Sequence, residues 1–318
     1  MNSEYFIGID GGGSKTAAIV VDSQGTRHGS GLAGGSNHLR IGIVEATRNV
    51  ERAVNIALVE AGIPIRDVRH AYCGIAGADH PTHRAEVVNA LSVFFPNGNF
   101  TVDSDARIAL TAAIGFGSGI VIIAGTGSVA FGRNDAAVEV RAGGWGPTLG
   151  DEGSGYWIAR KGLSAIVRAY DGRGPATKMT DLLCDDFEMC RPEDLPRFVY
   201  ASSTHADDIA RYGRLVVEAA GLNDPVALSI LDTAGRELGS CVLAVARRLR
   251  LTDSDFPVGY VGGAFHAKEL LLDPMRAEIA RLAPHARVVT PERSPAEGAA
   301  LMAMRAAVSP REGRAAGS

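Results

Sequence analysis

Apolar and β-branched residues gather in short runs early in the chain, and turns rich in glycine separate these runs. The runs at residues 5–10, 16–22 and 26–32 predict three strands. Apolar residues then recur at helical spacing over residues 43–61, and Gly62 is a typical stop after a helix. Strands and helices alternate from there on. The order predicts an α/β domain that opens with a three-stranded meander.

The same order starts again near residue 120. Runs at 120–124, 129–132 and 137–141 predict three more strands, and a tight glycine turn joins the first two. A long helical stretch follows, from about residue 153 to 251, before the next predicted strand at 258–261. We therefore expect two copies of one α/β unit. The second copy carries a helical insertion that suits an oligomer surface, and we predict a homodimer.

The length of 318 residues suits about two domains. We expect an N-terminal domain over residues 1–113, a C-terminal domain over 114–308 and a disordered tail over 309–318. A ligand site is expected in the cleft between the two copies, where both glycine turns can face one ligand.

Composition excludes several classes of protein. The net charge of −4 argues against a nucleic-acid-binding protein. No apolar run is long enough to span a membrane, and we expect neither a signal peptide nor a membrane partner. The chain has four cysteines, which are Cys73, Cys184, Cys190 and Cys241. No two of them form a C-x-x-C pair, and this argues against a zinc ribbon. We interpret them as reduced thiols of a cytoplasmic protein.

The first glycine turn runs from Asp10 through Gly11-Gly12-Gly13-Ser14 to Lys15. It is not a P-loop, because Ser14 stands where that motif needs glycine and a strand follows where it needs a helix. We expect a hairpin whose backbone N–H groups point at phosphate oxygens, with Asp10 near the accompanying metal. The alternative is an ordinary glycine hairpin.

A second turn, Gly125-Thr126-Gly127-Ser128, follows a strand of the same character in the second copy. Paired turns can hold a polyphosphate from two sides. Gly262 and Gly263 follow a later strand. They could pack against an adenosine or let a helix turn tightly, and the residues alone do not separate these two interpretations.

Asp103 and Asp105 stand between a predicted strand and a predicted helix. Either could be a helix N-cap, and either could orient an attacking hydroxyl and accept its proton.

Residues 143–155 have a composition that no core needs, with six glycines around Trp145, Asp151 and Glu152. An aromatic wall with carboxylates suits a sugar, while the alternative is a helix-capping loop. Asn37 lies in another polar loop, and we interpret His80 and His83 as surface histidines.

These motifs, in this order, resemble those of sugar kinases of the actin/hexokinase/heat-shock-70 superfamily. More narrowly, the chain resembles N-acetylglucosamine kinase members of the BadF/BadG/BcrA/BcrD ATPase family. The resemblance rests on Gly8-x-Asp10-Gly-Gly-Gly-Ser14, Ser36-Asn37-His38, Asp105-Ala106, the second glycine turn, Gly144-Trp145-Gly146, Gly150-Asp151-Glu152-Gly153-Ser154, Gly262-Gly263 and Pro295-Ala296-Glu297-Gly298-Ala299. It implies two ribonuclease-H-like domains and phosphorylation of an amino sugar at its 6-hydroxyl by ATP.

The resemblance also implies roles for single residues. Asp105 would be the catalytic base, and Asp10 would hold Mg²⁺ through water. Sugar contacts are implied for Asn37, Asp105, Ser128, Val129, Gly144, Trp145, Gly146 and Asp151. Nucleotide contacts are implied for Gly12, Gly13, Ser14, Lys15, Thr126, Gly127, Gly262 and Gly263.

Relatives with other functions carry motifs that are missing from this chain. The iron–sulfur cysteines of the activator proteins and the zinc cysteines of the repressor-type sugar kinases are absent. The Gly-Trp-Gly loop favours an N-acetylated sugar. We expect N-acetylglucosamine, while glucosamine, N-acetylmuramic acid and N-acetylmannosamine stay open as substrates. A nucleotide-switched ATPase that acts on a protein partner is the alternative from another class.

Overall fold

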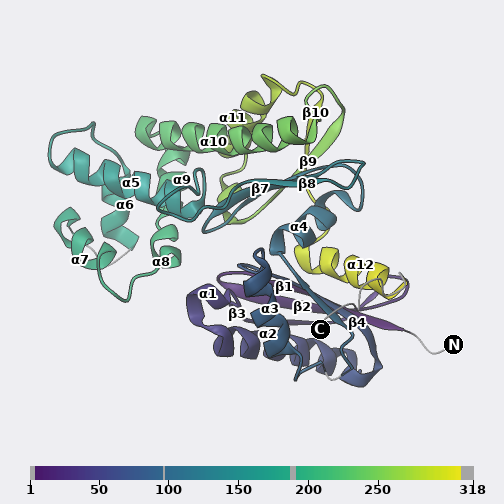
Figure 1. Ribbon diagram of the computed structural model, residues 1–318. Helices are drawn as coiled ribbons and strands as arrows, with labels where there is room; N and C mark the ends of the chain where they lie inside the picture. The colour runs from purple at the N-terminus through teal and green to yellow at the C-terminus, as the bar shows by residue number, and fades with distance from the viewer. Residues whose placement is uncertain (1–3, 96, 187–190, 309–318) are drawn as a thin grey trace. The chain divides into compact units, whose positions relative to one another are not determined.

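The computed structural model in Figure 1 describes residues 4–95, 97–186 and 191–308. The chain divides into two compact units. The first takes in the chain up to Phe116 and again from Pro291 onwards, and the second runs from Gly117 to Thr290. Each unit is built on its own five-stranded sheet, so the predicted α/β class is confirmed.

The first sheet has the strand order β3-β2-β1-β4-β5. Its strands are β1 (Tyr5–Gly11), β2 (Lys15–Asp22), β3 (Arg27–Gly34), β4 (Val68–Ile75) and β5 (Phe100–Asp103). The first three are joined as an antiparallel meander, while β4 and β5 continue the sheet in parallel with β1. Since parallel strands need crossover connections, helices stand between β3, β4 and β5.

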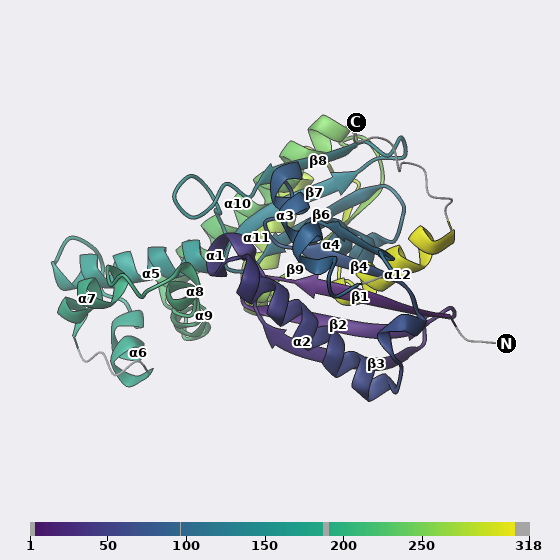
Figure 2. The ribbon, with the colours of Figure 1, turned by 60° about the horizontal axis from the view of Figure 1, so that its bottom comes forward.

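Helices cover both faces of this sheet, and Figure 2 shows α2 lying along one face. The helices are α1 (His38–Ile41), α2 (Ile43–Ala61), the short η1 (Ile65–Asp67), α3 (Pro81–Leu91), α4 (Asp105–Ile114) and α12 (Pro295–Val308). Ile7 and Ile9 of β1 face the core beneath α2 and α3, while Phe6 faces α4 and α12. Burial on both faces explains why β1 is apolar at successive positions.

The last helix, α12, belongs to the first unit, whereas the expected division placed it with the second half of the chain. Its backbone lies directly on β1: a β-carbon added at Gly8 would stand 2.1 Å from the carbonyl oxygen of Ala296. A β-carbon added at Gly298 would stand 2.2 Å from the Ile108 carbonyl oxygen of α4. Glycine and alanine at this contact let two helices and a strand pack backbone to backbone. The expected tail at 309–318 lies outside the described residues.

The second sheet repeats the topology of the first, with the order β10-β9-β6-β7-β8. Its strands are β6 (Gly119–Ala124), β7 (Ser128–Arg133), β8 (Glu139–Gly143), β9 (Phe256–Val261) and β10 (Ala286–Val289). Again the first three form an antiparallel meander, and the last two continue in parallel. The predicted duplication of one α/β unit is therefore confirmed.

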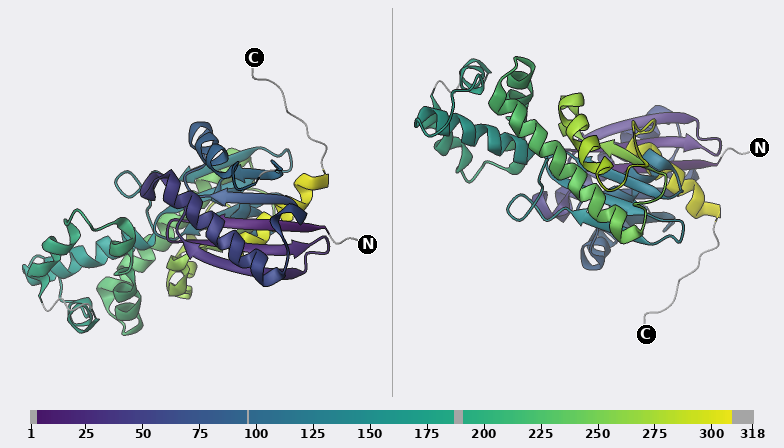
Figure 3. Two further views of the ribbon diagram at one scale, coloured as in Figure 1. Left: turned by 90° about the horizontal axis from the view of Figure 1, so that it is seen from below. Right: turned by 90° about the horizontal axis from the view of Figure 1, so that it is seen from above.

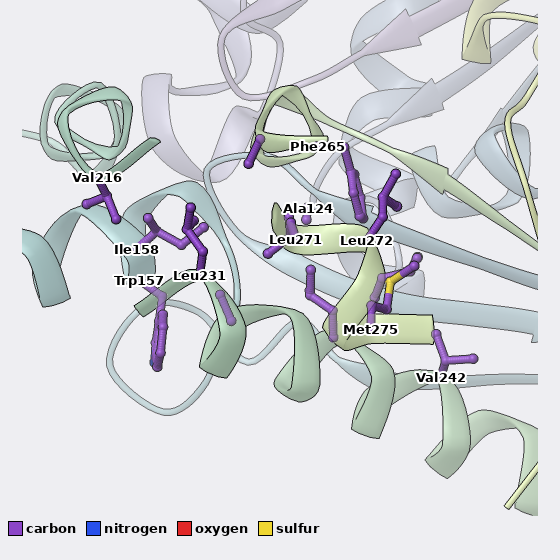
Figure 4. Close-up of a cluster of buried hydrophobic side chains, with 14 of the residues drawn as sticks. Ala124, Trp157, Ile158, Val216, Leu231, Val242, Phe265, Leu271, Leu272 and Met275 are labelled. Atoms are coloured by element: carbon purple, nitrogen blue, oxygen red, sulfur yellow. The ribbon is translucent and has the colours of Figure 1, made fainter. Parts of the chain in front are cut away.

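The predicted helical stretch of the second unit is a set of separate helices. They are α5 (Gly155–Tyr170), α6 (Met179–Asp186), η2 (Pro192–Asp194), α7 (Leu195–Val199), α8 (Ala206–Ala210), α9 (Gly213–Gly221) and α10 (Pro225–Leu249), with η3 (Gly263–Ala267) and α11 (Glu269–Ala280) after β9. Figure 3 shows the long α10 (green) crossing the second sheet. One end of α10 extends beyond the sheet, and the helices α5 to α9 gather there. Figure 4 shows Trp157, Leu231 and Met275 in the shared core.

Two further expectations concern single features. Within the described residues, no helix combines the length and the apolar character that a membrane span requires. Cys73 and Cys241 carry free thiols, and Cys190 lies outside the described residues.

Candidate active site

The turn between β1 and β2 has the hairpin form expected from the sequence. The Gly12 N–H donates to the Lys15 carbonyl over 2.9 Å and closes the turn. Strand β2 begins at Lys15, so no helix follows and the P-loop stays excluded. The Ser36 N–H donates to Gly12 (2.9 Å) and the Ala76 N–H to Gly11 (2.8 Å). The turn is thereby tied to the loops that follow β3 and β4.

Asp10 ends this strand beside the turn, and its carboxyl group is largely shielded from water. Burial raises the pKa of Asp10 to about 6, and the positive charge of Lys15 offsets part of that effect. Like the charge of Lys15, a cation bound near Asp10 would favour the ionised carboxylate and lower its pKa.

The two aspartates after β5 have opposite surroundings. Asp103 is 5% exposed and accepts hydrogen bonds from the Tyr72 hydroxyl (2.7 Å) and from Arg107 (2.8 Å). Its own next residue, Ser104, donates a backbone N–H over 2.8 Å, and Arg84 lies 3.4 Å away. Asp103 is therefore a paired, structural carboxylate.

Asp105 is the first residue of α4, and among the described residues no arginine pairs with it as Arg107 pairs with Asp103. Burial raises its pKa to about 7, and the negative charges of Asp79 and Asp10 add to this effect. The N-cap of α4 is Ser104, so neither aspartate is the cap. A carboxyl group that titrates near neutral pH suits a general base.

Asp79 is a site residue that the sequence analysis missed. It lies in the exposed loop between β4 and α3, yet its charge is the largest electrostatic influence on Asp105. An isolated aspartate two residues before a helix gives no sign in the sequence that it will lie near Asp105. The contact depends on where β4 and β5 end in the sheet.

The loop from Gly34 to His38 is rigidly braced. The Thr16 hydroxyl donates to Gly34 (2.7 Å), and Asn49 donates to the Gly35 carbonyl (2.8 Å). Asn37 caps α1, because its side-chain oxygen accepts the Leu39 N–H over 3.2 Å. The loop thus presents Asn37 from a fixed backbone.

The second glycine turn lies in the second unit and is closed by a 2.9 Å bond from the Gly125 N–H to the Gly127 carbonyl. The Gly155 N–H at the start of α5 donates to Gly125 over 2.8 Å. The Thr126 hydroxyl donates to the Asp207 carboxylate on α8. The Thr126 hydroxyl is therefore engaged within the protein.

Gly262 has a structural reason to be glycine. Its φ of +120° is open to few other residues, and an added β-carbon would stand 2.3 Å from the Ala124 carbonyl oxygen. Gly263, by contrast, is exposed and has open space around its α-carbon. Gly262 alone therefore makes the close approach of the chain to the end of β6.

The predicted sugar residues of the second unit form one connected group around Asp151. Its buried carboxylate accepts the backbone N–H groups of Ser128 and Gly146, and burial raises its pKa. The Ser128 carbonyl accepts the Gly144 N–H (2.8 Å), and an added β-carbon at Gly144 would stand 3.2 Å from a methyl group of Val129. Asp151 therefore joins the β6–β7 turn to the Gly-Trp-Gly loop.

The helix-capping alternative for this loop does not apply to Asp151. The N-cap of α5 is Ser154, whose hydroxyl accepts the Trp157 N–H over 3.1 Å. Trp145 is 65% exposed, and the Arg141 guanidinium lies 5.3 Å from the centre of its ring. An exposed tryptophan on a braced loop is available to a ligand.

The structure thus assembles the predicted residues in two groups. The first unit holds Asp10, Gly12, Gly13, Ser14, Lys15, Asn37 and Asp105, and the second holds Thr126, Gly127, Ser128, Val129, Gly144, Trp145, Gly146, Asp151, Gly262 and Gly263. In the first unit the Ser36 N–H links the loop after β3 to the first glycine turn, and in the second unit the Gly144 N–H links the Gly-Trp-Gly loop to Ser128.

Comparison with known proteins agrees with these motifs. The family model described as BadF/BadG/BcrA/BcrD ATPase family matches residues 7–303. The chain is 33% identical over 315 residues to a Dictyostelium discoideum protein named N-acetyl-D-glucosamine kinase, covering 96% of this chain and 99% of that protein. It is 31% identical over 300 residues to the N-acetylmuramic acid/N-acetylglucosamine kinase of Clostridium acetobutylicum, covering 94% and 98%.

Similarity extends to solved structures. A Chromobacterium violaceum protein of known structure superposes with a TM-score of 0.73 at 26% sequence identity. The match covers 96% of this chain and 100% of the Chromobacterium violaceum chain. The two-sheet fold described above is therefore shared over its full length.

Proposed function

Because the chain belongs to the BadF/BadG/BcrA/BcrD ATPase family, we propose that it is an ATP-dependent kinase that phosphorylates the 6-hydroxyl of N-acetylglucosamine. The two relatives that match almost the whole chain both carry N-acetylglucosamine kinase in their names. Kinase action on an amino sugar is the part that both names share. The 6-hydroxyl and the residue roles below are our assignment.

The observation that carries the mechanism is the contrast between Asp105 and Asp103. Burial raises the pKa of Asp105 to about 7, and no arginine within the described part of the chain pairs with it, so it can take up a proton near neutral pH. In the proposed step, the sugar 6-oxygen forms a bond to the γ-phosphorus while the bond to the β–γ bridging oxygen breaks. The hydroxyl proton passes to Asp105, and ADP leaves.

Asp10 on β1, Asp79 after β4 and Asp105 after β5 offer carboxylates that suit a magnesium ion held through water. The charges of Asp79 and Asp10 both act on Asp105, and burial raises the pKa of both Asp10 and Asp105. Mg²⁺ prefers such oxygen ligands and keeps several waters, so Asp10 would hold it through water. When bound, the ion would neutralise charge on the transferring phosphoryl group.

The remaining predicted residues divide between the two substrates. Backbone N–H groups of the two glycine turns would contact phosphate, through Gly12, Gly13, Ser14, Lys15, Thr126 and Gly127. Gly262 and Gly263 would contact the adenosine. Asn37 and the group around Asp151 (Ser128, Val129, Gly144, Trp145 and Gly146) would contact the sugar, with Trp145 supplying an apolar face. The homodimer, the cytoplasmic location and the absence of nucleic-acid or membrane partners stay predictions.

N-acetylmuramic acid is the second candidate substrate, because the Clostridium acetobutylicum relative is named for it as well. It differs from N-acetylglucosamine by a lactyl ether, so acceptance depends on room beside the ring rather than on the acetamide. Glucosamine and a sugar-independent ATPase remain the further alternatives.

The test is ADP release from Mg-ATP with N-acetylglucosamine, N-acetylmuramic acid, glucosamine, glucose and a blank without sugar. We expect strong stimulation by N-acetylglucosamine. The position of phosphorylation is read from the product by NMR coupling to phosphorus at C6. Stimulation by glucosamine alone would contradict the assignment of the Trp145 loop, and no stimulation by any sugar would favour a nucleotide-switched ATPase.

A further inference from the structure

A buried histidine without hydrogen-bond partners lies at the start of α1. The side chain of His38 is 2% exposed, and neither of its ring nitrogens has a partner in the described structure. Buried polar atoms are almost always paired, and leaving one unpaired costs about 1–3 kcal/mol. Two unpaired nitrogens on one buried ring therefore indicate a ligand.

Two further donor groups face His38 from helix α3. The rings of His38 and His83 have centres 5.7 Å apart, and the buried Nδ1 of His83 is also without a partner. Glu86 stands one turn after His83 on the same face of α3. Its Oε2 lies 4.0 Å from His38 Nε2 and 3.9 Å from His83 Nδ1, too far for hydrogen bonds.

These spacings are close to those of a metal centre. One donor atom from each of the three residues lies within 4.8 Å of the other two. Ligand atoms around a tetrahedral Zn²⁺ ion stand about 3.3 Å apart, given zinc–nitrogen bonds of about 2.0–2.1 Å. Moving each side chain inward by less than about 1 Å would reach that geometry.

The charge state of the group also suits a metal. Burial lowers the pKa of His38, and the neighbouring His83 lowers it further, while Glu86 acts in the opposite direction. A neutral imidazole keeps the lone pair that a metal needs. Two imidazoles and a carboxylate are a donor set typical of Zn²⁺, rather than of Mg²⁺ or Ca²⁺.

We infer that His38, His83 and Glu86 bind one Zn²⁺-class divalent ion, with a fourth position left for water. The ion would join the start of α1 to α3, two segments that the chain connects only through α2 and β4. Asn37 directly precedes His38, so the ion would hold its loop in place. This site is separate from the carboxylates at Asp10 and Asp105, which suit a harder ion.

The test is Zn²⁺ titration of the full-length protein by calorimetry, with Mg²⁺ in excess to occupy the carboxylates. We expect one equivalent to bind, a rise in Tm, and visible absorption bands from Co²⁺ bound in its place. The His83→Ala and Glu86→Gln variants should weaken Zn²⁺ binding by more than about 100-fold, since even an outer-sphere partner contributes 10–100-fold.

His80→Asn is the matched control. His80 is exposed, its ring lies 5.6 Å from that of His83, and its Nδ1 caps α3, a role that asparagine also performs. This variant should bind Zn²⁺ as the wild type does. The inference is overturned when the wild type binds no equivalent of Zn²⁺, or when His83→Ala, folded by circular dichroism, binds as well as the control.

The effect of the ion on catalysis rests on the proposed function and is measured separately. Zn²⁺ should lower KM for the sugar in the wild type and leave it unchanged in His83→Ala. Metal binding without any sugar response would retain the site and argue against Asn37 as a sugar contact.

Discussion

The Tyr72 hydroxyl donates a 2.7 Å hydrogen bond to the Asp103 carboxylate, and this bond separates the roles of two neighbouring aspartates. Asp103 lies on β5 and bonds to Tyr72 on β4 and Arg107 on α4, so it links these three elements. The pKa of Asp105, in contrast, is raised to about 7.

Alanine at these two positions should therefore have different effects. Asp105→Ala is expected to lower kcat by about 10²–10⁴, because it removes the proposed base. Asp103→Ala should lower the free energy of unfolding by about 1–3 kcal/mol, because the buried Tyr72 hydroxyl loses its acceptor. Steady-state kinetics and urea unfolding on both variants check this. A fully active Asp105→Ala enzyme would show that Asp105 is not the base.

The pH dependence of stability follows from the raised pKa of Asp105. In the folded protein this pKa is about 7, against an ordinary value of 3.8. The folded state therefore binds the proton more tightly, and the stability that the protonated group contributes is lost as the pH rises from about 4 to 7.

Asp105→Asn should remove this loss. Its Tm is expected to exceed that of the wild type at pH 8, by about 1–2 °C for each kcal/mol gained in a chain of 318 residues. The difference should shrink toward pH 4. Thermal melts without Mg²⁺ across this range give the measurement, and a Tm below the wild-type value at pH 8 would contradict the assigned burial of the charge.

Trp145 is expected to contribute to sugar binding but little to folding. Trp145→Ala should raise KM for N-acetylglucosamine about tenfold, which corresponds to the loss of about 1.4 kcal/mol of contact energy. Its Tm should stay within the range of a surface change, because the side chain is 65% exposed.

Leu149→Ala in the same loop is the control for this measurement. Leu149 is 79% exposed and has no assigned contact with the sugar, so its KM should match that of the wild type. Equal effects of the two substitutions would point to loop disturbance rather than to the aromatic face.

Packing of α12 on β1 should make Gly8 intolerant of any side chain. A β-carbon there would stand 2.1 Å from the Ala296 carbonyl, so Gly8→Ala forces the helix away from the strand. The expected loss is about 1–3 kcal/mol in urea unfolding. Gly221→Ala, with nothing within 4 Å, should leave stability unchanged or increase it slightly. Equal stability of the two variants would refute this packing.

Much of the fold could be predicted because local patterns decide it. The runs that became β1 and β2 are apolar on both faces, and the glycine turns after Asp10 and Ala124 stand at the same place in each copy. From the repeat we expected the second unit to begin at residue 114, and it begins at Gly117. The last helix was misplaced because its helical pattern is local, whereas the sheet that it covers is chosen by the close contact at Gly8.

The chemistry at single side chains depended on tertiary structure. Asp103 and Asp105 look alike in sequence, and only the position of Tyr72 and Arg107 makes one a structural carboxylate and the other a candidate base. His83 was interpreted as a surface histidine, yet its Nδ1 is buried opposite His38. Sequence periodicity determined the two α/β units and their glycine turns, because strands, helices and turns form from neighbouring residues. Partners and pKa values were decided by groups distant in the chain, because burial and Coulomb interactions act through space.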